Sequence, residues 1–210
     1  MRNPLPAGVL TACFVLGGCG GANVLVETTV PTPLVEPLPL TMGVHFDASL
    51  TDYVHEEDLE LYGKFRIELG STQVPVFERV FDAMFARTEH LESLDAPSAG
   101  VDAIIVPVVE ELQFSIPAQT RSDFFEIWIK YKIDIYDPNG ELLSSWPLPA
   151  YGKSNSRNFG FMESSSDLGL NEATIWALRD AAAHFAFYFP QAPEIRTLTA
   201  RATQAAQASG

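Results

Sequence analysis

Hydrophobic and polar residues alternate along several stretches of the chain, and this alternation predicts β-strands. In the clearest stretch, from Phe125 to Tyr136, every second residue is apolar and most residues between are polar or charged. A period of two is typical of a strand with one buried face. The sequence 137–140, Asp-Pro-Asn-Gly, then predicts a turn, because proline fixes φ and Asn-Gly accepts positive φ. The paired strand returns at residues 142–146, and further strands are predicted at residues 40–46, 64–69 and 101–116.

Apolar residues recur at helical spacing in two other segments. The first begins at Thr72 and ends near Thr88, and a polar connection follows it at residues 89–100. The second begins after Asn171, which can cap it, and ends before Pro190. Residues 147–170 carry many glycine, proline and serine residues and are interpreted as a loop.

The order of the predicted elements is β-β-α-β-β-β-α. Each helix has one apolar face that must be covered, and a sheet is the available partner. We therefore predict an α+β fold: a two-layer sandwich in which a mostly antiparallel sheet of about five strands carries both helices on one face.

The first residues have the parts of an export signal. Arg2 supplies a positive charge, and the apolar segment at residues 9–16 is too short to span a bilayer of about 30 Å. The following Leu16-Gly17-Gly18-Cys19 resembles the lipobox of bacterial lipoproteins. The resemblance implies diacylation of the Cys19 thiol, cleavage before Cys19 and acylation of the new amine. A second lipobox-like sequence ends at Cys13, but it leaves only about seven residues for the apolar segment. The alternative is a plain signal peptide.

These features divide the chain into four predicted parts. Residues 1–18 are a lipoprotein signal peptide, and residues 19–39 are the lipidated cysteine followed by a stalk rich in proline. Such a stalk is extended and could hold the domain up to roughly 60 Å from the membrane; the alternative is a loop lying on the domain. Residues 40–192 form a single periplasmic α+β domain, and residues 193–210 are a flexible tail. Because Gly20, rather than aspartate, follows the cysteine, we expect the outer membrane, periplasmic face, with the inner membrane as the alternative.

Composition excludes some classes of partner. The net charge of −14 repels nucleic acid and anionic headgroups, so no nucleic-acid partner is expected. Cys13 and Cys19 are the only cysteines in the 210 residues, so the exported part has neither a disulfide nor a thiolate metal site.

The sequence offers no clear catalytic or metal-binding constellation. The densest ligand-like cluster is His55-Glu56-Glu57-Asp58, but four adjacent side chains cannot all point at one ion, and we interpret it as a solvated acidic loop. His45 and His184 are interpreted as structural. The sequence also lacks a Gly-x-Ser-x-Gly elbow and a glycine-rich phosphate loop. We therefore expect no catalytic residues, no metal, no cofactor and no enzymatic activity.

The aromatic residues give a more informative signal. Trp128 and Tyr136 lie on the face of their strand opposite the isoleucine series, interleaved with Lys130 and Lys132. Exposed aromatic side chains beside cations are typical of recognition surfaces. More candidate partner-binding residues lie in or beside the 147–170 loop: Trp146, Tyr151, Arg157, Phe159 and Phe161. The alternative is that this loop folds over the open sheet face and buries the rings as a second small core.

The order of elements over residues 40–190 resembles several small lipoproteins of Gram-negative envelopes. The likeness rests on a strand after the Pro-rich segment, Ile67-Glu68-Leu69-Gly70 leading into a helix, the hairpin at Asn139-Gly140, and an alanine-rich helix at Ala177 to Ala186. The chain is similar to the auxiliary lipoproteins of ABC-type lipid transport, the lipopolysaccharide-assembly lipoprotein and YajG-like lipoproteins. This implies a non-enzymatic accessory or docking subunit with an envelope protein partner. The alternatives are a periplasmic lipid- or glycan-binding module, using a groove between sheet and helices, and an unrecognised hydrolase.

Overall fold

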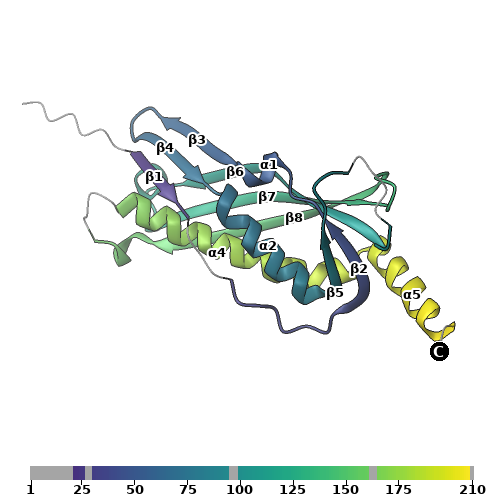
Figure 1. Ribbon diagram of the computed structural model, residues 1–210. Coiled ribbons are helices and arrows are strands. Elements are labelled where there is room, and N and C mark those ends of the chain that lie inside the picture. The colour runs from purple at the N-terminus through teal and green to yellow at the C-terminus, as the bar shows by residue number, and fades with distance from the viewer. Residues whose placement is uncertain (1–20, 27–29, 95–98, 161–164, 209–210) are drawn as a thin grey trace, which may run out of the picture.

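The computed structural model describes residues 21–26, 30–94, 99–160 and 165–208. The signal peptide, the lipobox with Cys19, and Phe161 therefore lie outside the described residues. Figure 1 shows an elongated molecule, with the first described strand and the C-terminal helix at opposite ends.

A five-stranded sheet forms the body of the molecule, in the order β5-β2-β6-β7-β8. The strands are β2 (Leu38–Val44), β5 (Phe85–His90), β6 (Ala103–Ser115), β7 (Phe124–Tyr136) and β8 (Leu142–Asn155). The long strands β6, β7 and β8 are antiparallel, whereas β2 is parallel to both β5 and β6. A second, three-stranded sheet has the order β1-β4-β3, from β1 (Gly21–Leu25), β4 (Gly63–Glu68) and β3 (Val54–Leu59).

Two long helices, α2 (Gly70–Met84) and α4 (Ser165–Tyr188), pack against the isoleucine face of the large sheet (Figure 1). The α+β class and the pairing of a five-stranded sheet with two helices on one face are confirmed. The remaining helices are α5 (Pro193–Ala208) and the short α1 (Ala48–Thr51) and α3 (Pro117–Thr120), with 3₁₀ turns at Ser156–Asn158 and Phe189–Gln191.

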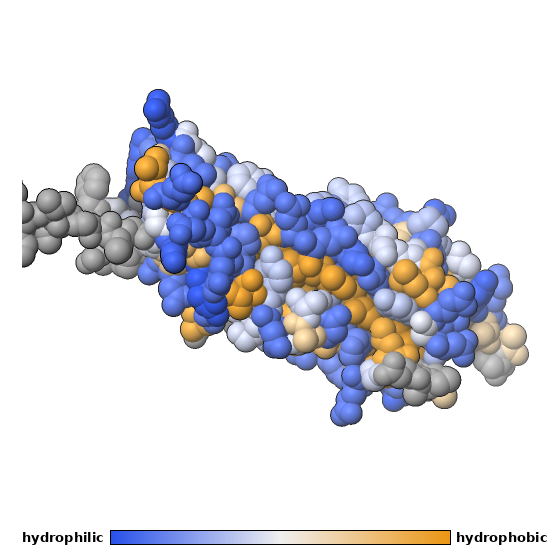
Figure 2. All heavy atoms as spheres, turned by 90° about the horizontal axis from the view of Figure 1, so that it is seen from above, coloured by the Kyte–Doolittle hydropathy of each residue, from blue (hydrophilic) through white to orange (hydrophobic). Residues whose placement is uncertain are grey.

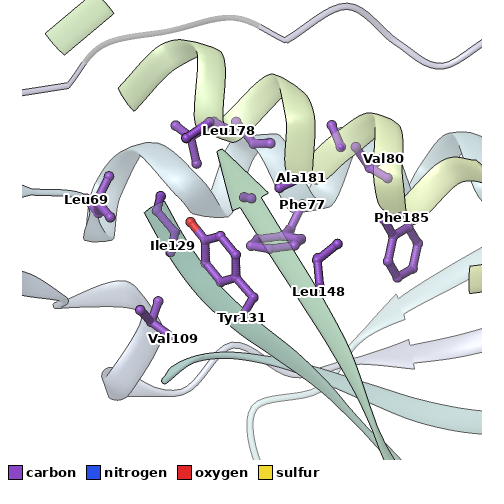
Figure 3. Close-up of a cluster of buried hydrophobic side chains, with 14 of the residues drawn as sticks. Leu69, Phe77, Val80, Val109, Ile129, Tyr131, Leu148, Leu178, Ala181 and Phe185 are labelled. Carbon is purple, nitrogen blue, oxygen red and sulfur yellow. The ribbon is translucent and has the colours of Figure 1, made fainter. Parts of the chain in front are cut away.

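The core lies between this sheet face and the two helices. Figure 3 shows the Tyr131 ring of β7 beside the Phe77 ring of α2, with Leu178 and Ala181 of α4 on the helix side of both. The Tyr131 hydroxyl donates to Gln73 Oε1 at 2.9 Å, and Gln73 Nε2 donates to the carbonyl of Leu50 at 2.7 Å. Every buried polar group in this chain of contacts therefore has a partner, which removes the cost of burying it.

The predicted stalk is the first correction. Within residues 19–39, Gly21–Leu25 form β1, which pairs in parallel with β4, and the Val24 and Val26 side chains are only 1% exposed. Arg79 of α2 also donates to the Val30 carbonyl at 2.8 Å. The prediction of an extended stalk is therefore wrong for residues 21–26 and 30. These residues pack on the domain, because burying their valine side chains is more favourable than leaving them in water.

The second correction concerns the segments on either side of α2. The acidic cluster at residues 55–58 lies in β3, an edge strand, and is not a loop. Charged side chains on an edge strand discourage pairing with another chain. The helix predicted to end near Thr88 ends at Met84. Strand β5 follows directly and runs to His90, into the region where a polar connection was predicted.

The third correction concerns the C-terminal third. Residues 147–155, predicted as loop, continue β8, and α4 begins at Ser165 instead of Asn171. The predicted flexible tail is the helix α5, in which Ile195 is fully buried and Leu198 and Ala202 pack against the core. These three residues recur at helical spacing, and Pro193 occupies the first helical position, where proline is favoured.

Candidate partner-binding face

The face of β6, β7 and β8 opposite the helices carries an exposed aromatic pair. Trp128 of β7 lies directly opposite Tyr151 of β8 in the antiparallel register, and their ring centroids are 5.4 Å apart. Their side chains are 40% and 37% exposed. Cross-strand aromatic pairs stabilise a sheet, and rings that stay exposed after pairing are available to a partner. We call the surface around Trp128 and Tyr151, on the side of β7 and β8 away from the helices, the aromatic face.

A carboxylate on the aromatic face holds Tyr151 in place. The Tyr151 hydroxyl donates to Glu126 Oε1 at 2.6 Å, and Ser115 Oγ donates to Glu126 Oε2 at 3.2 Å. Burial of the phenol and then the nearby Glu126 raise the pKa of Tyr151 to about 12. The phenol therefore remains a hydrogen-bond donor at every physiological pH.

This geometry predicts a delayed alkaline titration. With the raised pKa, Tyr151 should ionise near pH 12 instead of pH 10, measured as the chemical shift of its ring carbon in protein labelled with ¹³C-tyrosine. Glu126→Gln should move the midpoint downward, but only part of the way, because burial is the larger cause. Any stability linked to the raised pKa is fully present below pH 10 and is lost as the pH rises toward 12. A Tyr151 midpoint at pH 10 would contradict the hydrogen bond.

Paired charges border the aromatic face. Lys130 forms an ion pair with Glu110, and Lys132 forms one with Asp134, each at 2.8 Å. The hydrogen bond that the Lys130 ammonium donates to Glu110 raises the pKa of Lys130. A shallow groove of about 370 Å³ lies beside Trp128 and is lined in part by Gln113 and Pro149. The predicted cations beside the rings are thus present, but their charge is neutralised by neighbouring carboxylates.

The free edge of β8 offers no free backbone donor between Pro147 and Tyr151. The backbone N–H of Tyr151 points away from β7 and donates to Asp180 Oδ2 of α4 at 2.9 Å. Pro147 and Pro149 occupy positions of the same phase and have no N–H. A stretch of edge without free donors cannot complete a ladder with another strand. A partner of this part of the molecule would therefore meet the face of the sheet.

No protein-family model and no curated protein matches the sequence. Several solved structures have a distant likeness to it. A DUF330 protein from Xanthomonas campestris aligns with a TM-score of 0.49 and 10% identity over 80% of this chain and 94% of that chain. A minor lipoprotein from Acinetobacter baumannii aligns with a TM-score of 0.38 and 11% identity, over 79% of this chain and 95% of that chain. A protein described as a putative neuraminyllactose-binding hemagglutinin homologue from Helicobacter pylori aligns with a TM-score of 0.44 and 9% identity, over 85% of this chain and 100% of that chain. Likenesses this distant assign no function.

The structure separates the other predicted partner-binding residues from the aromatic face. Tyr136 is on the same side of β7, but it packs against a small second core of Val101, Ile104 and Val106. Trp146 lies on the opposite face, where its ring meets Phe185 and Phe189 at centroid distances of 6.0 and 5.2 Å. Trp146 is therefore half-buried against the core and lies away from the aromatic face.

Two further predicted residues lie at the far end of β8. Arg157 pairs with Asp123 at 2.6 Å, and Phe159 packs on Phe125 with ring centroids 6.4 Å apart. Arg157 also lines a cleft of about 710 Å³ with Ile116, Phe125 and Ser165. This end of the molecule borders residues 161–164, which lie outside the described residues, so the predicted role of Phe161 remains a prediction.

Helix α4 also carries three exposed aromatic residues that were not predicted from the sequence. Trp176, Phe187 and Tyr188 are 47%, 68% and 49% exposed, and Arg179 lies over the Trp176 ring with 5.1 Å between its guanidinium carbon and the ring centroid. Apolar residues on two sides of the helix could have indicated them, because a helix that only covers a sheet needs a single apolar face.

The histidines have structural surroundings. His45 Nδ1 is 2.8 Å from the Leu91 carbonyl, the His184 ring lies between Trp146 and Tyr188, and the ring of His55 meets Phe114. Within the described ranges, no three His, Cys, Asp or Glu side chains gather closely enough to hold a metal ion. Among the described helices, none combines the length and hydropathy needed to cross a bilayer.

Proposed function

We propose that this chain is a lipoprotein anchored through Cys19 to the periplasmic face of the outer membrane, where it acts as a non-enzymatic accessory or docking subunit of a transport or envelope-assembly complex. The anchor is supported by the lipobox Leu16-Gly17-Gly18-Cys19. The docking role is supported by one observation above others, the exposed Trp128–Tyr151 pair on the open sheet face.

The aromatic face has the features of a protein interface. Tryptophan and tyrosine carry much of the binding energy in protein complexes, and a rim of polar groups around them supplies specificity. The hydrogen bond to Glu126 already orders Tyr151, and the tilted Trp128 ring beside it restricts it further. A partner would therefore lose little side-chain entropy on binding these rings.

Removing the Trp128 ring should weaken the complex by about 30-fold, as expected for a residue that contributes about 2 kcal/mol to an interface. The lipidated protein and its Trp128→Ala and Tyr151→Ala variants would be crosslinked in membranes and recovered by a C-terminal tag. The wild type should bring down one envelope protein in stoichiometric amount, and both variants should lose it.

Trp176→Ala is the matched control, because it removes an exposed tryptophan from α4 instead of the sheet. It should retain the partner. If Trp176→Ala lost the partner while Trp128→Ala kept it, the docking surface would be α4 and the role of the aromatic face would be refuted. Urea unfolding of all three variants separates lost binding from lost folding.

The cleft beside Arg157 favours a second candidate function, a lipid- or glycan-binding module. Its apolar lining from Ile116 and Phe125 and the Arg157–Asp123 pair at its rim would suit an amphipathic ligand. Mass spectrometry of small molecules that copurify with the protein tests this candidate. A stoichiometric lipid that disappears in Phe125→Ala would support it, and ligand-free protein would exclude it.

A further inference from the structure

The chain enters the fold two residues after the proposed lipid attachment site. Gly21 is the first residue of β1 and lies opposite Lys64 of β4. The strand is held on its other side by Asp167, whose Oδ1 accepts from the Asn23 N–H at 3.2 Å. Because a residue of extended chain spans at most about 3.6 Å, the Cα atoms of Cys19 and Gly21 are at most about 7 Å apart.

The turn between β3 and β4 lies at the same end of the molecule as the beginning of β1 (Figure 1). Since β1 is parallel to β4 and Gly21 pairs with Lys64, residues 60–62 extend past Gly21 at the end where β1 begins. Leu61, at the tip of this turn, is 87% exposed. The Tyr62 hydroxyl donates to the Ala118 carbonyl at 3.1 Å and braces the turn against α3.

We propose that the anchored domain rests directly on the bilayer through the β3–β4 turn, with the Leu61 side chain in the interface between headgroups and acyl chains. The inference rests on the proposed lipidation of Cys19. The lipid fixes one point at the membrane, and the short connection leaves the turn no room to stand away from it. An exposed leucine gains from leaving water, and the brace from Tyr62 to α3 holds the turn that presents it.

The contact is shallow. Figure 2 shows isolated hydrophobic residues among hydrophilic ones at the end where β1 begins, whereas a longer hydrophobic band lies further along the molecule. The anchor therefore supplies the attachment and the turn sets the orientation. In that orientation the long axis points away from the membrane, and the β7–β8 turn and α5 lie at the distal end (Figure 1).

Hydrogen exchange of the lipidated protein in phosphatidylcholine vesicles tests this orientation. Amides of residues 59–63 should exchange at least about fivefold more slowly than in the unlipidated chain mixed with the same vesicles. Amides of residues 137–141, at the other end, should not change. Inserting a 20-residue Gly/Ser spacer between Gly20 and Gly21 should abolish the protection, because such a chain spans about 25 Å on average. Protection that is absent without the spacer, or unchanged by it, would overturn the proposal.

A chemical anchor keeps this result separate from the biological one. In the chain from residue 19 onward, Cys19 is the only cysteine, so its thiol can be coupled to a maleimide lipid in vesicles. Protection at residues 59–63 in the coupled protein supports the membrane contact even if cells do not lipidate Cys19. Conversely, lipidation in cells without protection in either preparation refutes the contact and leaves the anchor intact.

Substitution of the turn supplies a second measurement. When Cys19 is coupled to a single acyl chain, binding to vesicles is weak enough for one side chain to matter. Leu61→Asp should then lower the vesicle partition coefficient about tenfold, as expected for withdrawing a leucine from the interface. Leu143→Asp is the matched control, because Leu143 is 49% exposed at the start of β8 near the opposite turn. Equal partitioning of the two variants would count against the proposal.

Discussion

Gly152→Ala should lower the free energy of unfolding by about 3 kcal/mol, and Gly152→Val should prevent folding. Gly152 lies in β8 directly beneath α4. A Cβ atom at this position would overlap the Ala173 carbonyl oxygen and the Ala177 amide nitrogen. Both are backbone atoms of the helix, so no side chain can rotate away. The helix would have to lift from the strand, and the packing of Phe185 and its neighbours would loosen with it.

Urea unfolding followed by circular dichroism measures this effect. Gly100→Ala is the control, since Gly100 has a φ of +97° but has no atom within 4 Å of the added Cβ. That substitution should cost only about 1 kcal/mol, from backbone strain alone. If Gly152→Ala unfolded at the same urea concentration as Gly100→Ala, the close approach of α4 to β8 would be disproved.

The same residues explain why β8 was missed in the sequence. Pro147, Pro149 and Gly152 are typical of loops, and they led to the prediction of a loop from residue 147. In the structure each has a role that only an edge strand under a helix requires. The prolines sit where the N–H would face solvent, and the glycine admits the helix backbone. These requirements come from neighbours distant in sequence, which local pattern does not reveal.

The short parallel strands were hidden for a related reason. Phe85 continues the apolar spacing of the preceding helix, so the pattern predicts helix through Thr88. The chain instead leaves α2 at Met84, and Phe85 packs on Phe189 from another part of the chain. Likewise, β1 is a strand only because β4 and Asp167 are present beside it. The strong alternation along β7 can be recognised without knowledge of its partner strands, and β7 was predicted correctly.

The candidate site was predicted in part. Alternation along β7 correctly placed Trp128 on the face opposite the helices. Its partner Tyr151 was proposed only as a residue of a loop, because the cross-strand register depends on β8 reaching residue 155. Trp146 and Tyr151 are five positions apart, so a continuous strand must place them on opposite faces. The length of one strand therefore decides which aromatic residues can act together.

Cys19→Ser should abolish lipidation and, with it, the lipid-based membrane attachment of the mature protein. The sulfur is the proposed acceptor of the diacylglyceryl group, and a hydroxyl is not a substrate for thioether formation. The two or three acyl chains contribute roughly 0.8 kcal/mol per buried CH₂, far more than the contact at Leu61 can replace. The variant should fail to incorporate radiolabelled palmitate and should be recovered as unlipidated precursor or in the soluble fraction after cell lysis.

Cys13→Ser is the matched control, because it removes the only other sulfhydryl group and leaves the Leu16–Cys19 sequence intact. It should incorporate palmitate normally and yield a mature chain that begins at Cys19. If instead Cys13→Ser lost the label and Cys19→Ser kept it, the anchor would be at residue 13. Gly21 would then lie eight residues after the lipid, and this connection could span about 29 Å. In that case the domain would be free to stand away from the bilayer, so the position of one sulfur decides both the anchor and the orientation.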